Sequence, residues 1–388
     1  MRVIPVLCLT ALAIVLGACS PEPVPAPAPP PTPPAAASAP GPIALDDEKV
    51  LNIYNWPDYI PPETIAAFEK ETGVKINYDT YESNETMHAK VTAGSTGYDI
   101  AVTGNVFAKQ QVEGGIMQPL DKSKLTHYGN LDKNLMAKLA QDDPGNAHLI
   151  PWAWGFTTVG INKTKAERAL AGMPMPENAW DLVFNPQYTS KLKSCGIAFQ
   201  DSSTDVIPLA LHHIGKSPDS GDAADLKAAR EMLAKVRRDI RIFSNGMIDD
   251  LASGKACIAI GWSSEINMAA ARIKENGSSD VIEALIPRTG GIFFFDAMGI
   301  LKDAKHPKNA LAFMDFYLRP EYAAAMTNDF NYPTGNTAAT ALLKPEVLQN
   351  KSVSMSEADI QKLIFTGALS VAARSNMQQA FVAFKKGK

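Results

Sequence analysis

Aromatic residues stand beside carboxylates in three separate segments of this chain, of which the first and the last lie about two hundred residues apart. The segments are Tyr54-Asn55-Trp56-Pro57-Asp58-Tyr59, Gly261-Trp262-Ser263-Ser264-Glu265 and Phe293-Phe294-Phe295-Asp296. Ring faces attract an organic cation and pack on its methylenes, and carboxylates accept hydrogen bonds from an ammonium group. If the segments meet in one cleft, they predict a ligand that carries more than one positive charge.

Each of these acids and aromatics also has a purely structural explanation when it is taken alone. Asp58 follows an expected strand, where an aspartate commonly forms a turn or caps a helix. Trp262 could belong to the core. The negative charge of Glu265 could stabilise the N-terminus of the following helix. Asp296 is harder to explain, because an acid directly after three phenylalanines should either be paired or face a cavity. The four positions together therefore favour a binding site.

The positions of these segments relative to the expected strands support one shared cleft. In open α/β sheets, ligands bind beyond the carboxyl ends of the strands. Four segments follow expected strands in this way: Trp56 to Asp58 after 49–54, Gly104-Asn105 after 98–103, Asp201 to Asp205 after 196–199, and Trp262 to Glu265 after 256–261. We expect all four to face the space between two such sheets.

The length and charge of the chain limit what it can be. With 388 residues it is too long for one compact core and suits two α/β lobes. Its formal net charge of −4 gives no support for nucleic-acid binding. It is compatible with a cationic ligand, although many soluble proteins are mildly acidic.

Strands and helices alternate from residue 49 onward, which predicts mixed or parallel sheets flanked by helices. An aromatic segment over 149–155 interrupts this alternation, and we expect the chain to cross between lobes there and begin a new strand over 158–162. Residues 283–287 should lead back toward the first sheet, and a final helix should run over 356–385. The predicted lobes comprise 46–154 plus 286–330, and 155–285 plus 331–388.

The N-terminal segment predicts export from the cytoplasm. Arg2 precedes an apolar run over 3–16 that has the length of a signal-peptide core and is short for a membrane span. The run ends in Leu16-Gly17-Ala18-Cys19, which is similar to a bacterial lipoprotein signal with Cys19 as the lipidated residue. The alternative is a secretory signal that is cleaved without lipidation. Residues 20–45, rich in Pro and Ala, are expected to form an extended linker between signal and folded part.

The remaining cysteines are consistent with an oxidising compartment. Cys8 lies within the expected signal, which leaves Cys195 and Cys257 in the folded part. We expect these two to form a disulfide, the alternative being two unrelated buried thiols. Neither a CxxC motif nor a Cys/His spacing typical of zinc sites occurs in the sequence, so we expect no metal and no cofactor.

Several motifs together make the chain resemble the periplasmic polyamine-binding proteins of ABC transporters, above all their putrescine-binding branch. The resemblance extends from Val50 to Lys388. It rests on six segments: Tyr54-Asn55-Trp56-Pro57-Asp58-Tyr59-Ile60, Ala93-Gly94-Ser95-Thr96-Gly97-Tyr98-Asp99, Gln118-Pro119-Leu120-Asp121-Lys122-Ser123-Lys124-Leu125, Leu192-Lys193-Ser194-Cys195-Gly196, Ala259-Ile260-Gly261-Trp262 and Phe294-Phe295-Asp296.

The resemblance implies a two-lobed periplasmic-binding-protein clamshell of type II, with the ligand between the lobes. It also implies that Cys195 and Cys257 are the disulfide pair of the family. The residues that it assigns to the ligand are Trp56, Asp58, Tyr59, Asp205, Ser244, Trp262, Glu265, Phe294, Asp296 and Tyr332. We expect Asp58 and Asp296 to hold one ammonium group and Asp205 and Glu265 to hold the other, with the aromatic rings around the methylenes.

Four positions depart from the pattern of the putrescine-binding branch. Pro57 and Gly104 stand where that branch has serines, which removes two hydroxyl acceptors. Glu265 replaces an aspartate, and Asp205 replaces a glutamate. These changes alter the length of the pocket and its hydrogen bonding, so the sequence predicts the polyamine class without selecting one polyamine.

The expected function is that of a non-enzymatic solute-binding lipoprotein, which delivers a polyamine to a membrane ABC permease. We expect a monomer in the periplasm, anchored to a membrane through Cys19. A polyamine sensor without a transport role is one alternative. A carboxylate-dependent hydrolase is another, but the sequence contains no G-x-S-x-G, HExxH, P-loop or GxGxxG motif that would support an enzyme.

Overall fold

The computed structural model describes residues 43–367 and 369–387. The predicted signal with Cys19 and nearly all of the predicted linker lie outside these residues, so both stay predictions. The part of the chain up to the first long strand contains β1 Val50–Asn55, α1 Pro62–Thr72, β2 Lys75–Thr80, α2 Asn84–Ala93, β3 Ile100–Gly104, α3 Asn105–Glu113, α4 Lys133–Leu139 and β4 Leu149–Asn162. Short 3-10 turns lie at Lys122–Lys124, Tyr128–Asn130 and Pro144–Asn146.

The middle of the chain forms a second set of strands and helices. These are α5 Lys163–Leu170, α6 Asp181–Phe184, α7 Pro186–Leu192, β5 Ile197–Gln200, α8 Ser203–His213, α9 Ala223–Val236, β6 Ile242–Ser244, α10 Met247–Ala252, β7 Ile258–Trp262, α11 Ser263–Glu275 and β8 Ile282–Ala284, with a 3-10 turn at Arg237–Asp239. The chain then continues through β9 Ile292–Ile300, α12 Pro307–Tyr317, α13 Pro320–Phe330, the 3-10 helix Thr337–Leu342, α14 Pro345–Gln349, α15 Glu357–Ile360, β10 Ile364–Phe365 and α16 Val371–Lys385.

Local sequence signals set the ends of the early helices. Pro62 occupies the first turn of α1, and Gly73 ends the helix in the left-handed conformation, with its N–H bonded to the carbonyl of Glu69. The side chain of Ser83 caps α2 by accepting a hydrogen bond from the backbone N–H of Thr86. These signals explain where α1 begins and ends and where α2 begins.

The strands join in one sheet with the order β2-β1-β3-β9-β4-β7-β5-β6, while β10 pairs with β9 and β8 with β4. The pairs within β2-β1-β3 and within β7-β5-β6 are parallel. The pairs β3-β9, β9-β4 and β4-β7 are antiparallel. The sheet is therefore mixed, and two parallel groups of strands are joined through β4 and β9.

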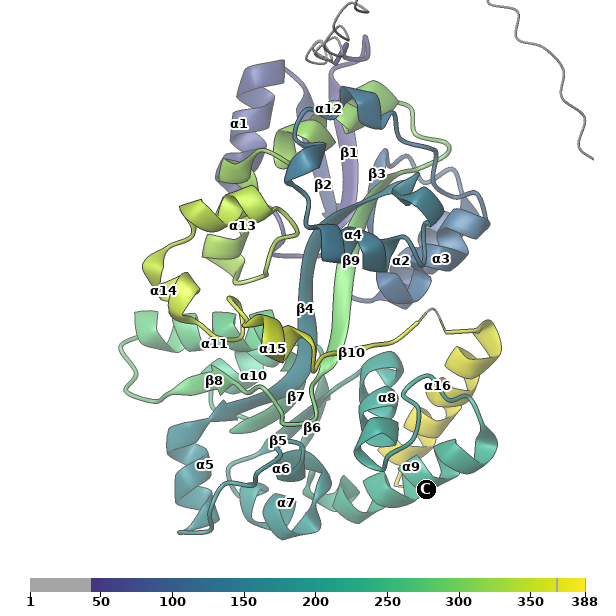
Figure 1. The fold of residues 1–388 in the computed structure, drawn as a ribbon. Coiled ribbons are helices and arrows are strands. Elements are labelled where there is room, and N and C mark those ends of the chain that lie inside the picture. The colour runs from purple at the N-terminus through teal and green to yellow at the C-terminus, as the bar shows by residue number, and fades with distance from the viewer. Residues whose placement is uncertain (1–42, 368, 388) are drawn as a thin grey trace, which may run out of the picture. The chain divides into compact units, whose positions relative to one another are not determined.

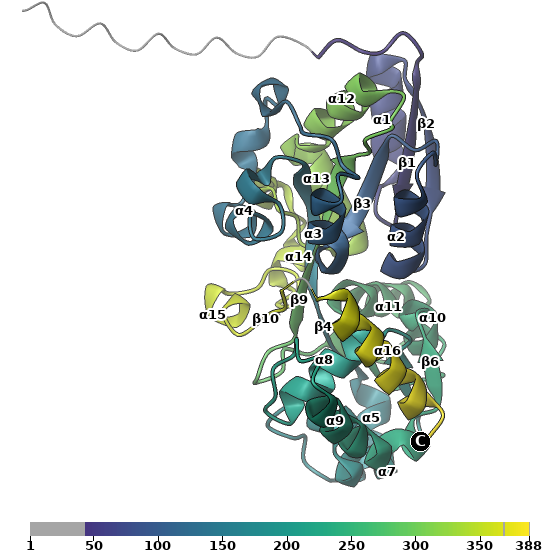
Figure 2. The same ribbon diagram turned by 90° about the vertical axis from the view of Figure 1, so that its right-hand side faces the viewer.

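Two main hydrophobic cores lie on the two sides of this central pair. The first core is formed largely by residues of β1, β3 and α12 with the first half of β4. The second core is formed by residues of β5, β7, α8 and α16 with the second half of β4. Figures 1 and 2 show β4 and β9 running from one group of helices into the other. We call these two groups the first and the second lobe; the residue boundaries predicted for them stay a prediction.

The structure corrects the expected break between 149–155 and 158–162, because β4 is one strand from Leu149 to Asn162. A register shift between Pro151 and Ala153 interrupts its pairing with β9. Proline lacks the N–H that a regular ladder needs, and an irregularity at this point lets the strand continue. The crossing between the lobes is thus made by the strand itself, rather than by a connection between two strands.

Two other expectations about the chain path were wrong. Residues 282–284 form β8, which pairs with β4, and the return to the first lobe is made by β9. The helix expected over 356–385 is two helices with β10 between them. There the backbone N–H of Ile364 bonds to the carbonyl of Gly291, so pairing with β9 replaces helical hydrogen bonds. Ser370 then caps α16 by accepting a hydrogen bond from the N–H of Ala373.

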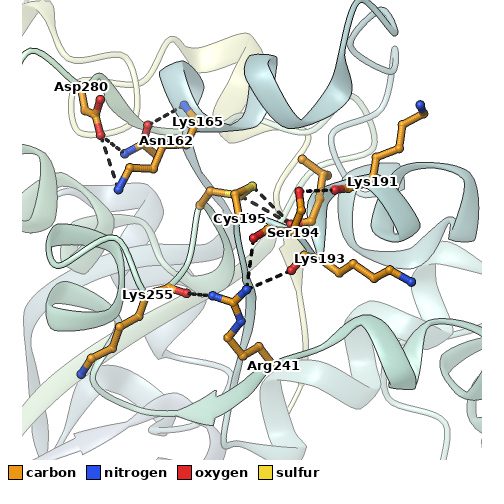
Figure 3. Close-up of a disulfide and its surroundings, with 11 residues drawn as sticks. Asn162, Lys165, Lys191, Lys193, Ser194, Cys195, Arg241, Lys255 and Asp280 are labelled. Carbon is orange, nitrogen blue, oxygen red and sulfur yellow. Dashed lines mark hydrogen bonds and ion pairs between the residues drawn. A yellow bond between two sulfur atoms is a disulfide. The ribbon is translucent and has the colours of Figure 1, made fainter.

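The expected disulfide between Cys195 and Cys257 is present, with their Cα atoms 5.5 Å apart. It ties the end of α7 to the residue before β7 in the second lobe. Figure 3 shows Arg241 beside it, whose guanidinium donates hydrogen bonds to the carbonyls of Lys255 and Lys193 at 2.9 and 3.1 Å. The disulfide and this arginine hold neighbouring segments of the second lobe together.

Among the described residues, no helix is both long and apolar enough to cross a membrane.

We predict that replacing Cys195 and Cys257 together by serine lowers the free energy of unfolding. The disulfide closes a loop with a sequence separation of 62, and the chain-entropy argument gives a loss of about 4 kcal/mol. Urea unfolding of the oxidised wild type and of the double variant measures this difference. Ligand affinity should change little, because neither cysteine lines the cavity described below. Equal stability of the two proteins would contradict the prediction.

Candidate functional site

A cavity lies between the two lobes, where β1, β3, β5 and β7 end and where β9 passes. It is lined by Trp56, Pro57, Tyr59, Asn84, Gly104, Asn105, Val106, Thr204, Asp205, Trp262, Glu265, Ile292, Phe293, Phe294, Asp296, Tyr332 and Thr366. Eight of the ten predicted ligand-binding residues are among them. The described residues that line it include three carboxylates and no lysine or arginine.

Asp296 is the most enclosed of the three acids, with only 4% of its surface exposed. It lies on β9, and its carboxylate accepts hydrogen bonds from the Tyr59 hydroxyl at 2.6 Å and from the Trp56 indole at 3.3 Å. Burial raises the pKa of Asp296 to about 6, although these two hydrogen bonds oppose the shift. A nearby positive charge would therefore stabilise the charged form of Asp296.

Asp205 lies in the first turn of α8 and belongs to the second lobe. Its carboxylate accepts hydrogen bonds from the hydroxyls of Thr157 and Ser202 at 2.7 and 2.5 Å, and from the indole of Trp262 at 3.3 Å. Burial raises the pKa of Asp205, while the three hydrogen bonds lower it. These donors fix the orientation of the carboxylate before any ligand arrives.

Glu265 lies in the first turn of α11, on the same side of the cavity as Asp205. Its Oε2 is buried and makes no hydrogen bond within the described part of the chain. Burial, together with the negative charges of Asp58 and Asp205, raises the pKa of Glu265 to about 8. A large part of the Glu265 population is therefore protonated at neutral pH, and a cation would reverse this.

Aromatic rings from both lobes enclose the space between the acids. The ring centroids of Trp56 and Trp262 lie 5.8 Å apart, and those of Trp262 and Phe294 lie 6.3 Å apart. Tyr59 and Tyr332 pack at 4.5 Å. Gly155 makes room for this arrangement, because a Cβ at that position would lie 2.7 Å from the Phe294 ring. The enclosure offers ring faces and edges to an apolar chain.

Two predicted site residues do not line the cavity. The side chain of Asp58 is exposed, and its backbone adopts φ 54°, a left-handed turn beside the site. Its charge still reaches the cavity, since it raises the pKa of Glu265. Ser244 lies at the end of β6, where its hydroxyl accepts a hydrogen bond from the N–H of Gly246 at 2.8 Å. Neither residue is positioned in this structure to contact a molecule inside the cavity.

Sequence reasoning missed several residues of the cavity. Asn84 lines it from the start of α2, and Thr366 lines it from the end of β10. Thr157 orients Asp205 from β4. The position of Asn84 directly after a strand and a cap was a usable signal. The role of Thr157 had none, because a threonine within an apolar strand reads as an ordinary strand residue.

The sequence pattern of the bacterial extracellular solute-binding proteins matches residues 63–354. The chain belongs to this family. It is a family of binding proteins rather than enzymes, and the resemblance predicted from the sequence motifs is confirmed.

Individual relatives cover nearly the whole folded part. A putrescine-binding periplasmic protein of Pseudomonas aeruginosa is 42% identical over 88% of this chain and 93% of its own length. A putrescine-binding periplasmic protein of Escherichia coli is 40% identical over 82% of this chain and 86% of its own. The structure is also similar to a spermidine/putrescine ABC transporter substrate-binding protein of Streptococcus pneumoniae, with a TM-score of 0.72, 28% identity and coverage of 87% and 99% of the two chains. The predicted two-lobed fold is confirmed, and the family places the protein in the periplasm.

The raised pKa of Glu265 predicts how the stability of the ligand-free protein depends on pH. The folded protein keeps a proton on Glu265 between about pH 4.5 and 8, whereas the unfolded chain loses it. The free energy of unfolding should therefore fall as the pH rises through this range. Glu265→Gln should remove most of this loss, a difference on the order of 2–4 kcal/mol between pH 5 and pH 8.

Urea unfolding at pH 5 and pH 8 measures this effect. Glu275→Gln, at the exposed end of the same helix, is the matched control and should retain the wild-type pH dependence. If Glu265→Gln and wild type lose the same stability between the two pH values, the proposed electrostatic environment of Glu265 is wrong.

Proposed function

We propose that this protein captures a polyamine with at least two ammonium groups in the cavity between its lobes and delivers it to an ABC importer. One observation carries the proposal: Asp205, Glu265 and Asp296 converge from both lobes on one aromatic cavity whose described lining residues include no lysine or arginine. Buried carboxylates are costly unless they are paired, and a dication would pair them. Relatives named as putrescine-binding proteins support the same ligand class.

The two ends of the ligand would meet different sets of partners. One ammonium would lie at Asp296, whose carboxylate is oriented by Tyr59 and Trp56. The other would lie between Asp205 and Glu265 on the second lobe. The sequence suggested that Asp58 and Asp296 hold this ammonium together. Because the side chain of Asp58 is exposed, we assign it only a contribution to the negative potential of the site. The methylenes would pack among Trp56, Trp262, Phe294 and Tyr332.

Binding at both ends would favour the approach of the two lobes. The rings of Trp56 and Trp262 come from different lobes and lie within packing distance. A ligand can shift this equilibrium only by the difference between its affinities for the closed and the open form. A micromolar site requires about 8 kcal/mol of net binding free energy, which two charge-assisted ends and a buried methylene chain can supply. The lobes would thus act as a clamp around a dication.

The remaining parts of the proposal concern attachment and assembly. Cys19, with small residues before it, would carry lipid and hold the protein at a membrane. The linker over 20–45 would give the folded part reach toward the permease. We propose that the protein is a monomer.

Asp296→Asn should weaken putrescine binding at least tenfold, because it removes the charge that would face one ammonium. Isothermal titration calorimetry measures this change, and thermal unfolding checks that the fold persists. The matched control is Asp201→Asn. That acid also follows a second-lobe strand, but it pairs with Lys385 at 2.6 Å outside the cavity. Wild-type affinity in Asp296→Asn would refute the assignment of this residue.

Binding of a dication at pH 7 should release protons, since a nearby ammonium lowers the raised pKa of Glu265. The observed binding enthalpy should then vary with the ionisation enthalpy of the buffer, and the release should be much smaller in Glu265→Gln. Calorimetry in phosphate and in Tris measures the number of protons. An enthalpy that is the same in both buffers would contradict the position of Glu265 beside the ligand.

A thermal-shift panel with putrescine, cadaverine, spermidine, spermine and agmatine tests the proposed function directly. At least one of these should raise the unfolding temperature in a concentration-dependent way, because a ligand that binds only the folded state stabilises it. No shift with any of the five would overturn the polyamine assignment.

A further inference from the structure

We propose that Asn84 and Asn105 form a wall of hydrogen-bond donors in the cavity, which selects a diamine that also carries an acceptor oxygen, such as a hydroxyl group. This inference rests on the proposed function, because it concerns the ligand of the same cavity. Both residues line the cavity, and they lie on either side of Gly104 at the end of β3. Neither is among the ten residues that the family resemblance assigns to the ligand, although Asn105 belongs to a segment that the sequence placed at the cleft.

The missing side chain of Gly104 gives Asn84 its place. A Cβ at position 104 would lie 2.8 Å from Oδ1 and 2.9 Å from Nδ2 of Asn84, which is closer than a real Cβ can approach. The carboxamide therefore lies directly against the glycine. Its Oδ1 accepts a hydrogen bond from the Gly104 N–H at 3.2 Å. Any side chain at position 104 would displace the carboxamide from this place.

Asn105 is held in a similar way from the other side. It begins α3, and only 2% of its surface is exposed. Its Oδ1 accepts a hydrogen bond from the backbone N–H of Phe295 at 3.4 Å, which is long for such a bond. That N–H lies on β9 between the two cavity residues Phe294 and Asp296. The carboxamide is thus anchored to the strand that carries one acid of the site.

These contacts fix which end of each carboxamide is free. Of the two ends of a carboxamide only the oxygen accepts a hydrogen bond, so Oδ1 of each asparagine must face the backbone N–H. The Nδ2 of each then remains, and the side-chain hydrogen bonds of both residues to other described residues involve only Oδ1. Because both residues line the cavity, their N–H groups are available to a molecule inside it.

A wall of donors distinguishes between ligand groups. An ammonium group has only N–H donors and cannot pair with Nδ2, whereas a hydroxyl or carbonyl oxygen can. The N-termini of α2 and α3 lie at the same wall, and their partial positive charge also disfavours an ammonium there. The wall therefore opposes a positive charge beside Gly104 and favours an oxygen. The acids elsewhere in the cavity keep their preference for the two cationic ends.

A matched pair of ligands tests this proposal. Putrescine and 1,4-diaminobutan-2-ol differ only by one hydroxyl group. The wild type should bind the hydroxylated diamine about three- to tenfold more tightly, as one additional hydrogen bond allows. Isothermal titration calorimetry of both ligands gives the ratio of the two dissociation constants, and this ratio is the measured quantity.

Three variants change the wall. Asn84→Asp replaces the free donor by an acceptor and should fold, because an acid is favourable in the first turn of a helix. Gly104→Ala should displace the Asn84 carboxamide, and Asn105→Ala removes the second donor. Each should bring the ratio toward one, and Asn84→Asp combined with Asn105→Ala should abolish the preference. Asn178→Asp is the control, since its Nδ2 donates to Thr289 outside the cavity, and it should keep the wild-type ratio.

The outcomes separate this proposal from the proposed function. Equal affinity of the wild type for both diamines would overturn the donor wall, and so would a wild-type hydroxyl preference in the folded variant that combines Asn84→Asp with Asn105→Ala. In both cases, binding of putrescine that is lost in Asp296→Asn would leave the polyamine function standing. If neither diamine binds the wild type, the polyamine function itself fails.

Discussion

The burial of three carboxylates in one cavity is the constraint on which the rest of this structure depends. Asp205, Glu265 and Asp296 are removed from bulk water near one another, and burial raises the pKa of each. Hydrogen bonds from Trp56 and Tyr59 offset part of the free-energy cost of burying Asp296. Hydrogen bonds from Thr157, Ser202 and Trp262 do the same for Asp205. Glu265 has no such compensation at Oε2. The charged forms of these three acids are therefore unfavourable in the empty cavity, and an organic dication would stabilise them.

The central strands β4 and β9 connect these buried acids to the arrangement of the lobes. Asp296 and Phe294 lie on β9, which pairs with β3 of the first lobe and with β4, whereas Asp205 and Glu265 belong to helices of the second lobe. A cation held at both ends would therefore act across the two lobes. The aromatic contact between Trp56 and Trp262 closes the same space from the sides. The positions of the acids and of the aromatic rings in the cavity therefore both depend on how β4 and β9 join the two lobes.

The polar groups at the strand ends give the cavity a second chemical character. The carboxylates face it as acceptors, and the two asparagines beside Gly104 contribute donors whose direction is fixed by backbone N–H groups. A site built only to attract positive charge would not require such donors. Acceptors at two places and donors at a third define a ligand by the positions of its groups as well as by its net charge.

The sequence by itself determined the family, the two α/β lobes, the disulfide and eight of the ten cavity residues that it indicated. It could do so because strand ends, helix caps and aromatic-acid motifs are local patterns that repeat in related chains. Cys19, the linker and the residue boundaries of the lobes stay predictions. The ligand roles of the site residues do as well.

Only the tertiary structure decided that β4 is continuous, that Asp58 and Ser244 lie outside the cavity, and that Asn84 fills the space beside Gly104. Each of these depends on contacts between segments that are distant in the sequence. Asp58 lies exposed at a left-handed backbone position beside the cavity, and Asn84 reaches Gly104 because position 104 has no Cβ. Local patterns identify which residues lie near a strand end, but only the packing of the whole chain sets the direction of each side chain.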